Sequence, residues 1–468
     1  MRHKKGDSRQ QSTLFPESLD EFVSEDNPVR VIDAFIESLD MSDLGFTLAT
    51  TKDTGRKPYH PADLLKLYTY GYLNQVRSTR RLEKECHRNV EVLWLMKRLS
   101  PDFKTIANFR QQNSSAIQQA CRAFIQFCRE SKLLDGRLIA IDGSKFKAAA
   151  SMSKTYNRKQ LDVLQKRLNR KINGYLNELA KSEKNENEDE LGSVQEALRK
   201  LQSRQKKLDV LAREMDETNA TQCCETEPEA KRMRSGRDGI VVGYNIQTAV
   251  EDETGLIVYH DVTDEGSDNR QLEPMAKSVQ AELEKEELIV LADAGYSNGE
   301  QLADCEEAGI EPVVPPNRAV NNKGDFYQKH DFQYDKDRDL YICPAGKELH
   351  YQTYHSKNKM KLYARTGCQN CPLQSQCTKA DRRWISRHFY EEALERTAGR
   401  VRENPHLMRR RSAVVERPFA HLKQIMGLRR FQCWGKEGAK AEMGLGVLAY
   451  NLNRMINEIG AQKLISLI

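Results

Sequence analysis

The sequence predicts a mixed α/β protein that begins with a long helical region. Three observations support this prediction. Apolar residues recur at helical spacing through residues 1–135, short apolar runs that end in an acidic residue follow, and long helical patterns lie between and after those runs. Strands interspersed with helices are typical of a sheet covered by helices. With 468 residues, the chain is long enough for several structural units.

Residues 1–135 are predicted to form a helical, DNA-binding domain. The segment DNPVRVIDAFIESL opens with a capping Asp or Asn, and HPADLLKLYTYGYLN has Pro at an early helical position. The basic segment RSTRRLEKECHRN places Arg77, Arg81, Lys84 and Arg88 at three- and four-residue spacing, and hence on one helical face. Such a face suits phosphate contact or groove insertion, as in a helix-turn-helix unit. A helical bundle with a charged, solvated face explains the pattern equally well.

A mixed sheet is predicted to begin after residue 135. The run RLIAIDGSKFKA is a short buried strand with Asp142 at its end, and ELIVLADAGY is a second strand that ends in Asp293. Between them, GYNIQTAVEDETGLIVYHDV alternates apolar and polar residues on both sides of EDETG, which predicts a hairpin. We assign three segments to this mixed α/β core: residues 136–157, 219–324 and 386–468.

Two insertions are predicted to interrupt the core. Residues 158–218 keep three-and-four apolar spacing on both sides of the polar stretch NENEDELG, which predicts an antiparallel helical hairpin. Residues 325–385 combine short strands, aromatic residues and four cysteines, which are Cys343, Cys368, Cys371 and Cys377. Four thiols with one CxxC pair form the donor set of a closed, structural zinc site. A reduced, metal-free cysteine cluster is the alternative.

Composition and charge narrow the functional classes. The 74 Lys and Arg residues exceed the 68 Asp and Glu residues by only 6, but basic residues are crowded near residues 77–88 and 382–430. Local positive faces of this kind are what phosphate binding requires. No apolar run is long enough to span a bilayer, and no apolar stretch follows the basic N-terminus as in a secretory signal. Because the eleven cysteines also argue against a disulfide framework, we expect a cytoplasmic protein.

Three acidic residues are candidates for a metal site. Asp142 and Asp293 end apolar strands, and Glu416 lies in the predicted helix VVERPFAHLK. Two carboxylates at strand ends and one on a covering helix can converge, and such oxygen ligands hold Mg²⁺ or Mn²⁺. A single Asp at a strand end is more often a turn or cap residue, so spacing alone does not select these three.

The chain resembles the DDE transposases of bacterial insertion sequences, whose catalytic core is ribonuclease-H-like. The resemblance covers nearly the whole chain. It is carried by the helical region HPADLLKLYTYGYLNQVRSTRRLEKECHRN and, in order, by LIAIDGSKFKA, GYNIQTAVEDETGLIVYHDV, LIVLADAGYSNGEQL and VVERPFAHLKQIMGLRRF. It implies a ribonuclease-H-like core that uses Mg²⁺ or Mn²⁺ to cleave DNA strands and transfer them at the ends of an insertion sequence. The catalytic, metal-holding residues would be Asp142, Asp293 and Glu416.

The resemblance also implies contacts with DNA. Related transposases often carry Lys seven positions after the Glu, which Lys423 matches, whereas their Arg and Tyr four and seven positions before it correspond to Ser412 and Arg409 here. We therefore expect Arg411 to contact phosphate in their place. The full set of expected phosphate contacts is Lys145, Arg411, Lys423, Arg77, Arg81 and Arg88.

The expected partners are double-stranded DNA, as terminal inverted repeats and target DNA, and further copies of the chain when it is bound to DNA ends. This implies association with the nucleoid. Two alternatives remain: a domesticated DNA-binding protein without catalytic activity, and a DNA nuclease on the same fold.

Overall fold

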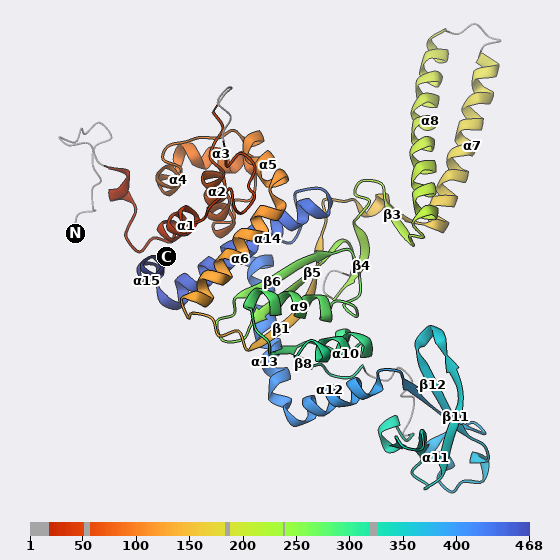
Figure 1. The fold of residues 1–468 in the computed structure, drawn as a ribbon. Coiled ribbons are helices and arrows are strands. Elements are labelled where there is room, and N and C mark those ends of the chain that lie inside the picture. Colours follow the sequence, from red (N-terminus) through yellow and green to blue (C-terminus); the bar gives the residue numbers. More distant parts are fainter. Residues whose placement is uncertain (1–17, 51–56, 183–187, 237–238, 318–325) are drawn as a thin grey trace, which may run out of the picture.

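The computed structural model describes residues 18–50, 57–182, 188–236, 239–317 and 326–468, and it confirms a mixed α/β fold (Figure 1). Helices from both ends of the chain pack together beside a central sheet, and two further units project from this body (Figure 1). In the described residues no helix is both long and apolar enough to cross a membrane.

The N-terminal region consists of short helices, as the sequence predicts. Their starts follow from local capping: the side chains of Asn27, Asn89 and Asp102 each accept hydrogen bonds from the first backbone N–H groups of the helix that follows. The helices are α1 (Pro28–Glu37), α2 (Pro61–Leu73), α3 (Thr79–Arg88), α4 (Val90–Leu95), α5 (Phe103–Gln112) and α6 (Ser114–Glu130).

The central sheet has the strand order β4-β5-β1-β7-β8, and β6 also pairs with β5. Strands β1, β7 and β8 are parallel, whereas β5 is antiparallel to β1, β4 and β6. Three parallel strands beside the antiparallel hairpin of β5 and β6 match the ribonuclease-H-like core that the resemblance implies. The strands are β1 (Leu138–Lys147), β4 (Lys231–Ser235), β5 (Gly239–Glu251), β6 (Ile257–Thr263), β7 (Leu288–Leu291) and β8 (Ile310–Val313).

Helices that follow the strands cover the sheet. Helix α13 packs on β1, β5 and β7, and α14 packs on β6 and on the N-terminal helices α2, α5 and α6. The N-terminal helices and the sheet therefore share one hydrophobic core rather than forming two separate ones. The helices are α9 (Leu272–Leu283), α10 (Gly299–Glu307), α12 (Glu391–Glu403), α13 (Pro405–Ala420), which continues into a π-helical turn at His421–Ile425, α14 (Gly435–Ile459) and α15 (Ala461–Leu467).

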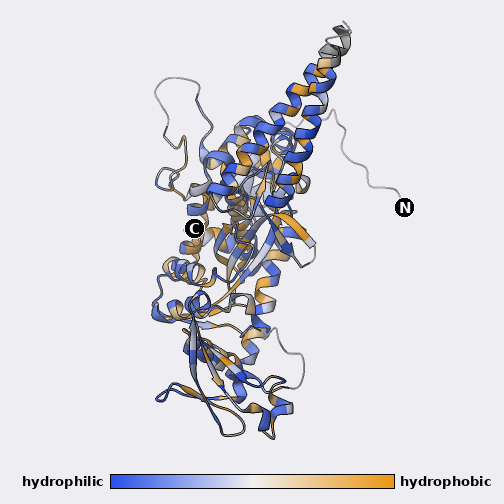
Figure 2. Cartoon of the chain, turned by 90° about the vertical axis from the view of Figure 1, so that its right-hand side faces the viewer, coloured by the Kyte–Doolittle hydropathy of each residue, from blue (hydrophilic) through white to orange (hydrophobic). Residues whose placement is uncertain are grey.

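A long helical hairpin projects from the body (Figure 1). Helices α7 (Arg158–Ser182) and α8 (Glu188–Glu217) pack against each other through a small core of their own. At the base of the hairpin, β2 (Thr155–Asn157) pairs with β3 (Gln222–Cys224). Hydrophilic and hydrophobic residues are interspersed along both helices (Figure 2), as expected for a pair that buries one stripe of each helix.

The second projecting unit is a small antiparallel sheet that contains the four clustered cysteines. Its strand order is β13-β12-β11-β10-β9, and an aromatic core that includes Phe332, Tyr341 and Tyr363 supports it. It lies between β8 and α12 in the chain. Its elements are β9 (Gln333–Asp335), β10 (Leu340–Ile342), β11 (Glu348–His355), β12 (Met360–Arg365), α11 (Gln374–Cys377) and β13 (Arg383–His388).

Arg77, which the sequence predicts to contact phosphate, has a side chain that is only 9% exposed. One of its terminal nitrogens, Nη2, lies 2.8 Å from Oε2 of Glu442, a residue of α14 that is fully buried. The same guanidinium donates to the carbonyl oxygens of Gly427 and Arg430. The other oxygen of Glu442 accepts from the backbone N–H of Gln432 at 2.6 Å. Arg77 thus joins the N-terminal helices to the C-terminal ones.

We expect Arg77→Ala to lower the free energy of unfolding by about 3–5 kcal/mol, because it leaves the Glu442 carboxylate buried without its closest cation. Arg81→Ala is the matched control: Arg81 lies in the neighbouring helix α3 with its side chain in solvent, so its loss should change stability by about 0.5 kcal/mol or less. Urea unfolding of both variants measures the difference. Equal stability of the two variants would show that the Glu442 ion pair contributes little.

Candidate active site

The sheet places Asp142 and Asp293 at the same level of neighbouring strands. Strands β1 and β7 are parallel, and Ala140 of β1 is in register with Leu291 of β7. Asp142 and Asp293 each come two residues later, so both side chains lie at the same level and on the same face of the sheet. Asp293 follows the end of β7, whereas β1 continues to Lys147, so Asp142 does not end its strand as the sequence predicted. The sequence prediction that these two acids meet follows from this register.

Arg411 of α13 lies between the two aspartates. Its Nη2 is 2.9 Å from Oδ1 of Asp142 and 3.9 Å from Oδ2 of Asp293. One helical turn later, Val415 packs against Ala140 and Leu291, which fixes this face of α13 against β1 and β7. A single cationic group is therefore within reach of both carboxylates.

The two aspartates differ in their surroundings. Burial raises the pKa of Asp142 to about 6; the Arg411 guanidinium opposes this rise, and the Asp293 charge adds to it. Asp293 is more exposed, and its Oδ1 accepts a hydrogen bond of 2.8 Å from the backbone N–H of Gly295. Asp293 is thus a turn-capping residue, the alternative that its position in the sequence suggested, while its Oδ2 faces Arg411.

Lys423 and Lys145 lie on opposite faces of β1. Lys423 follows α13 in the π-helical turn, and its Nζ donates to Ser144 Oγ at 2.6 Å and to the Lys145 carbonyl oxygen at 3.0 Å. Because side chains alternate along a strand, Ser144 shares its face with Asp142, whereas the Lys145 side chain points the other way. Lys423 thus lies on the face of β1 that carries Asp142, next to Ser144.

Lys145 belongs to a polar cluster that the sequence did not reveal. Its Nζ lies 3.2 Å from Asp268, which also accepts hydrogen bonds of 2.7 Å from Asn245 and Gln247. The Lys145 side chain, which the sequence predicts to contact phosphate, is only 10% exposed. Asp268 lies in a loop without a distinctive pattern, and only the pairing of β1 with β5 brings these residues together.

Glu416 is the third predicted acid, and it is not joined to the other two. It is exposed on α13, directly after the buried Val415, and its side chain makes no hydrogen bond or ion pair with another described residue. Within the described ranges, no three His, Cys, Asp or Glu side chains are arranged so that they could hold a metal ion. The structure therefore brings together two of the three acids, with Arg411 between them.

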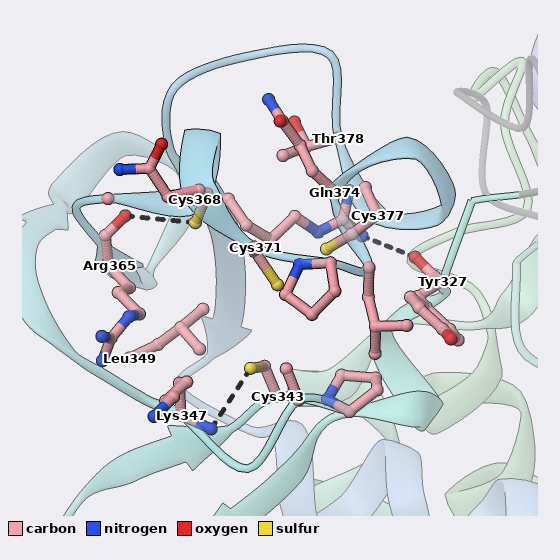
Figure 3. Close-up of a pocket in the computed structure, with 17 residues that line it drawn as sticks. Tyr327, Cys343, Lys347, Leu349, Arg365, Cys368, Cys371, Gln374, Cys377 and Thr378 are labelled. Atoms are coloured by element: carbon pink, nitrogen blue, oxygen red, sulfur yellow. Dashed lines mark hydrogen bonds between the residues drawn. The ribbon is translucent and has the colours of Figure 1, made fainter.

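The four clustered cysteines line one cavity of about 270 Å³ in the small sheet unit (Figure 3). None of them is in a disulfide. The Cys343 sulfur accepts a hydrogen bond of 3.4 Å from the Lys347 backbone N–H, and burial raises the pKa of the Cys377 thiol. The sulfur atoms are neighbours, but they are not in metal-binding geometry.

The remaining cationic candidates lie on α3. Arg81, Lys84 and Arg88 are exposed, while Leu82 and Cys86 of the same helix are buried. Arg88 is paired with Glu85, its neighbour one turn earlier, at 2.5 Å. The basic face predicted from the sequence is thus in solvent, without Arg77.

Transposase family models match two parts of the chain. A transposase DDE domain matches residues 342–456, and a transposase domain (DUF772) matches residues 17–112. The first range contains Glu416 and the four cysteines, and neither range contains Asp142 or Asp293. The two matches confirm the resemblance to insertion-sequence transposases of the DDE class.

Comparison with other proteins adds two findings. No curated protein matches the sequence. Among solved structures, the cryo-EM structure of the piggyBac transposase synaptic complex with hairpin DNA is 8% identical in sequence, with a TM-score of 0.33. That match covers 94% of this chain and 79% of the other.

The raised pKa of Asp142 makes stability depend on pH. Because the folded protein holds the Asp142 proton to about pH 6, the carboxyl stabilises the fold most below its ordinary pKa of 3.8, and this contribution is lost as the pH rises through 6. Asp142→Asn removes the titration. In metal-free buffer, the free energy of unfolding of the variant, relative to that of the parent, should therefore rise by about 2–3 kcal/mol between pH 4 and pH 7. Urea unfolding across this range measures the gain, and a constant difference would contradict the prediction.

Proposed function

We propose that this chain, which carries domains of insertion-sequence DDE transposases, cleaves DNA strands and transfers them at the ends of an insertion sequence with the help of divalent metal. The observation that carries the proposal is the aspartate pair, with Asp142 within β1 and Asp293 directly after β7, and one cation between them. The transposase family matches on both sides of this pair support it.

The residues at the site fit a hard divalent cation. Asp142 and Asp293 offer carboxylate oxygens, the ligands that Mg²⁺ and Mn²⁺ prefer, and both are within reach of one positive group. Glu416, exposed on the helix that covers these strand ends, would supply the third carboxylate. When bound, such metal activates an attacking water or hydroxyl and stabilises the leaving oxygen of a phosphodiester.

Cationic side chains would position the DNA. Lys423, next to Ser144 on the aspartate face, and Arg411 can neutralise the phosphate at the reacting bond. Arg81 and Arg88 on the exposed face of α3 would bind the backbone further away. The partner would be double-stranded DNA, at inverted repeats and at the target, bound at the nucleoid by more than one copy of the chain.

Strand transfer on DNA that carries the repeats flanking the coding sequence tests this function. In Mg²⁺ or Mn²⁺, the parent should cut and join, whereas Asp142→Asn, Asp293→Asn and Glu416→Gln should lower both rates by about a thousand-fold or more, because each removes a metal ligand. Binding of the same DNA should persist. Glu403→Gln, which changes an exposed acid of the neighbouring helix α12, is the control and should retain activity.

The same assay separates the two alternatives. A nuclease on this fold would cut without joining, and a domesticated DNA-binding protein would do neither in any metal. The intact aspartate pair favours the catalytic proposal over the binding protein, since a chain that only binds DNA does not require two neighbouring carboxylates.

We also propose that the cysteine cavity binds a structural zinc ion. The supporting observation is the donor set: four free thiols line a single cavity in a unit with a small core, and one sulfur already accepts a backbone N–H. Binding would require the sulfur atoms to close around the ion. Such closure is typical of sites whose metal binding is coupled to folding.

Metal analysis of the purified protein should find about one zinc per chain, and Cys371→Ser should lose it, because a closed site needs all four thiolates. Cys433→Ser changes a free cysteine outside the cavity and should keep the zinc. Equal zinc content in the parent and in Cys371→Ser would refute the assignment.

A further inference from the structure

The geometry around Arg411 differs from that of an ordinary structural ion pair. Only Nη2 of its guanidinium approaches the two aspartates, and its Nε is buried without a hydrogen-bond partner. The side chain is 12% exposed. A buried N–H group without a partner is costly, so this position of Arg411 leaves part of its bonding capacity unused.

The neighbouring Arg410 shows the contrast on the same helix. Its Nε donates to Asp252 Oδ1 at 2.6 Å while its Nη2 pairs with Asp252 Oδ2. This is the two-bond fork that makes arginine–carboxylate pairs strong and specific. Arg410 is therefore fixed to one carboxylate by two nitrogens, whereas Arg411 approaches two carboxylates with one nitrogen.

We propose that Arg411 is an internal counterion: it occupies the place of the metal between Asp142 and Asp293 in the metal-free protein, and the divalent cation displaces it toward the DNA phosphate. This inference rests on the proposed metal-dependent function. It assigns Arg411 a positioning role that couples metal binding to DNA binding, in addition to the phosphate contact expected from the sequence.

For electrostatic reasons, Arg411 and a divalent cation cannot both lie between Asp142 and Asp293. Two carboxylates at one level of adjacent strands repel each other unless a positive charge lies between them, and the fixed positive charge of Arg411 supplies it. A metal ion binds such oxygens at about 2.0–2.6 Å, and Arg411 Nη2 is already 2.9 Å from Asp142 Oδ1. Both cations would occupy the same few ångströms and repel each other. Metal entry therefore requires Arg411 to leave.

The displaced guanidinium has a suitable acceptor in the proposed complex. A phosphate offers several oxygens to a planar fork, which would also satisfy the Nε that is unpaired here. Metal and DNA would then strengthen each other's binding, because each favours the position of Arg411 that the other requires, and such coupling is reciprocal. In the absence of both ligands, the arginine keeps the aspartate pair neutralised and closed to other cations.

Calorimetric titration of the DNA-free protein with Mn²⁺ tests the proposal without any catalytic readout. Arg411→Ala and Arg411→Gln remove the competing charge and should each bind Mn²⁺ about ten-fold more tightly than the parent. Arg411→Lys keeps a charge and should stay near the parent. Arg410→Ala is the matched control, because it removes one arginine from the same helix without touching the aspartate pair, and its affinity should be unchanged.

The outcomes separate this proposal from the proposed function. If Mn²⁺ binding is lost in Asp142→Asn but is equal or weaker in both neutral Arg411 variants, the metal site exists and the counterion role is wrong. If Asp142→Asn binds Mn²⁺ as the parent does, the proposed metal site itself fails, and the counterion role fails with it. Tighter binding in Arg410→Ala to the same degree would also overturn the proposal, since a general loss of positive charge would then explain the effect.

Discussion

The register between two parallel strands sets the positions of Asp142 and Asp293. Because Ala140 faces Leu291 across β1 and β7, the chain must place two carboxylates side by side at the next outward positions. Like charges at one site need a cation, and in this structure α13 provides it through Arg411. Val415 holds that helix against the same two strands. Sheet register, helix packing and charge neutralisation are therefore parts of one constraint.

A second buried charge connects the ends of the chain. Glu442 in α14 is fully buried, and Arg77 from the turn before α3 neutralises it. The N-terminal helices therefore cannot detach without leaving both charges without a partner. The shared hydrophobic core makes the same connection through apolar contacts. The exposed basic face of α3 is thus attached firmly to the body that carries the two aspartates.

The sequence predicted the local elements well and the long-range contacts less well. Apolar periodicity and caps such as Asn27 and Asp102 are local signals, so the sequence predicted the helices, the strands that carry Asp142 and lead to Asp293, and the helical pattern at 158–218. It placed the end of the first of these strands too early, since β1 continues from Asp142 to Lys147. The burial of Arg77 depends on a partner more than three hundred residues away, and the Asp268 cluster depends on strand pairing, so periodicity alone could not reveal either. Glu416 was selected by family resemblance, and no contact in the described residues tests its role.

The two projecting units are attached at informative points of the chain. The helical hairpin follows β1, the strand that carries Asp142, and the cysteine-bearing sheet comes directly before α12 and α13, the helices that lead to Arg411 and Glu416. Each unit has its own apolar cluster, so it can vary in length and surface without disturbing the strand register. Both units thus join the body next to elements that carry residues of the candidate site. The register of the central sheet, rather than either insertion, fixes the positions of Asp142 and Asp293.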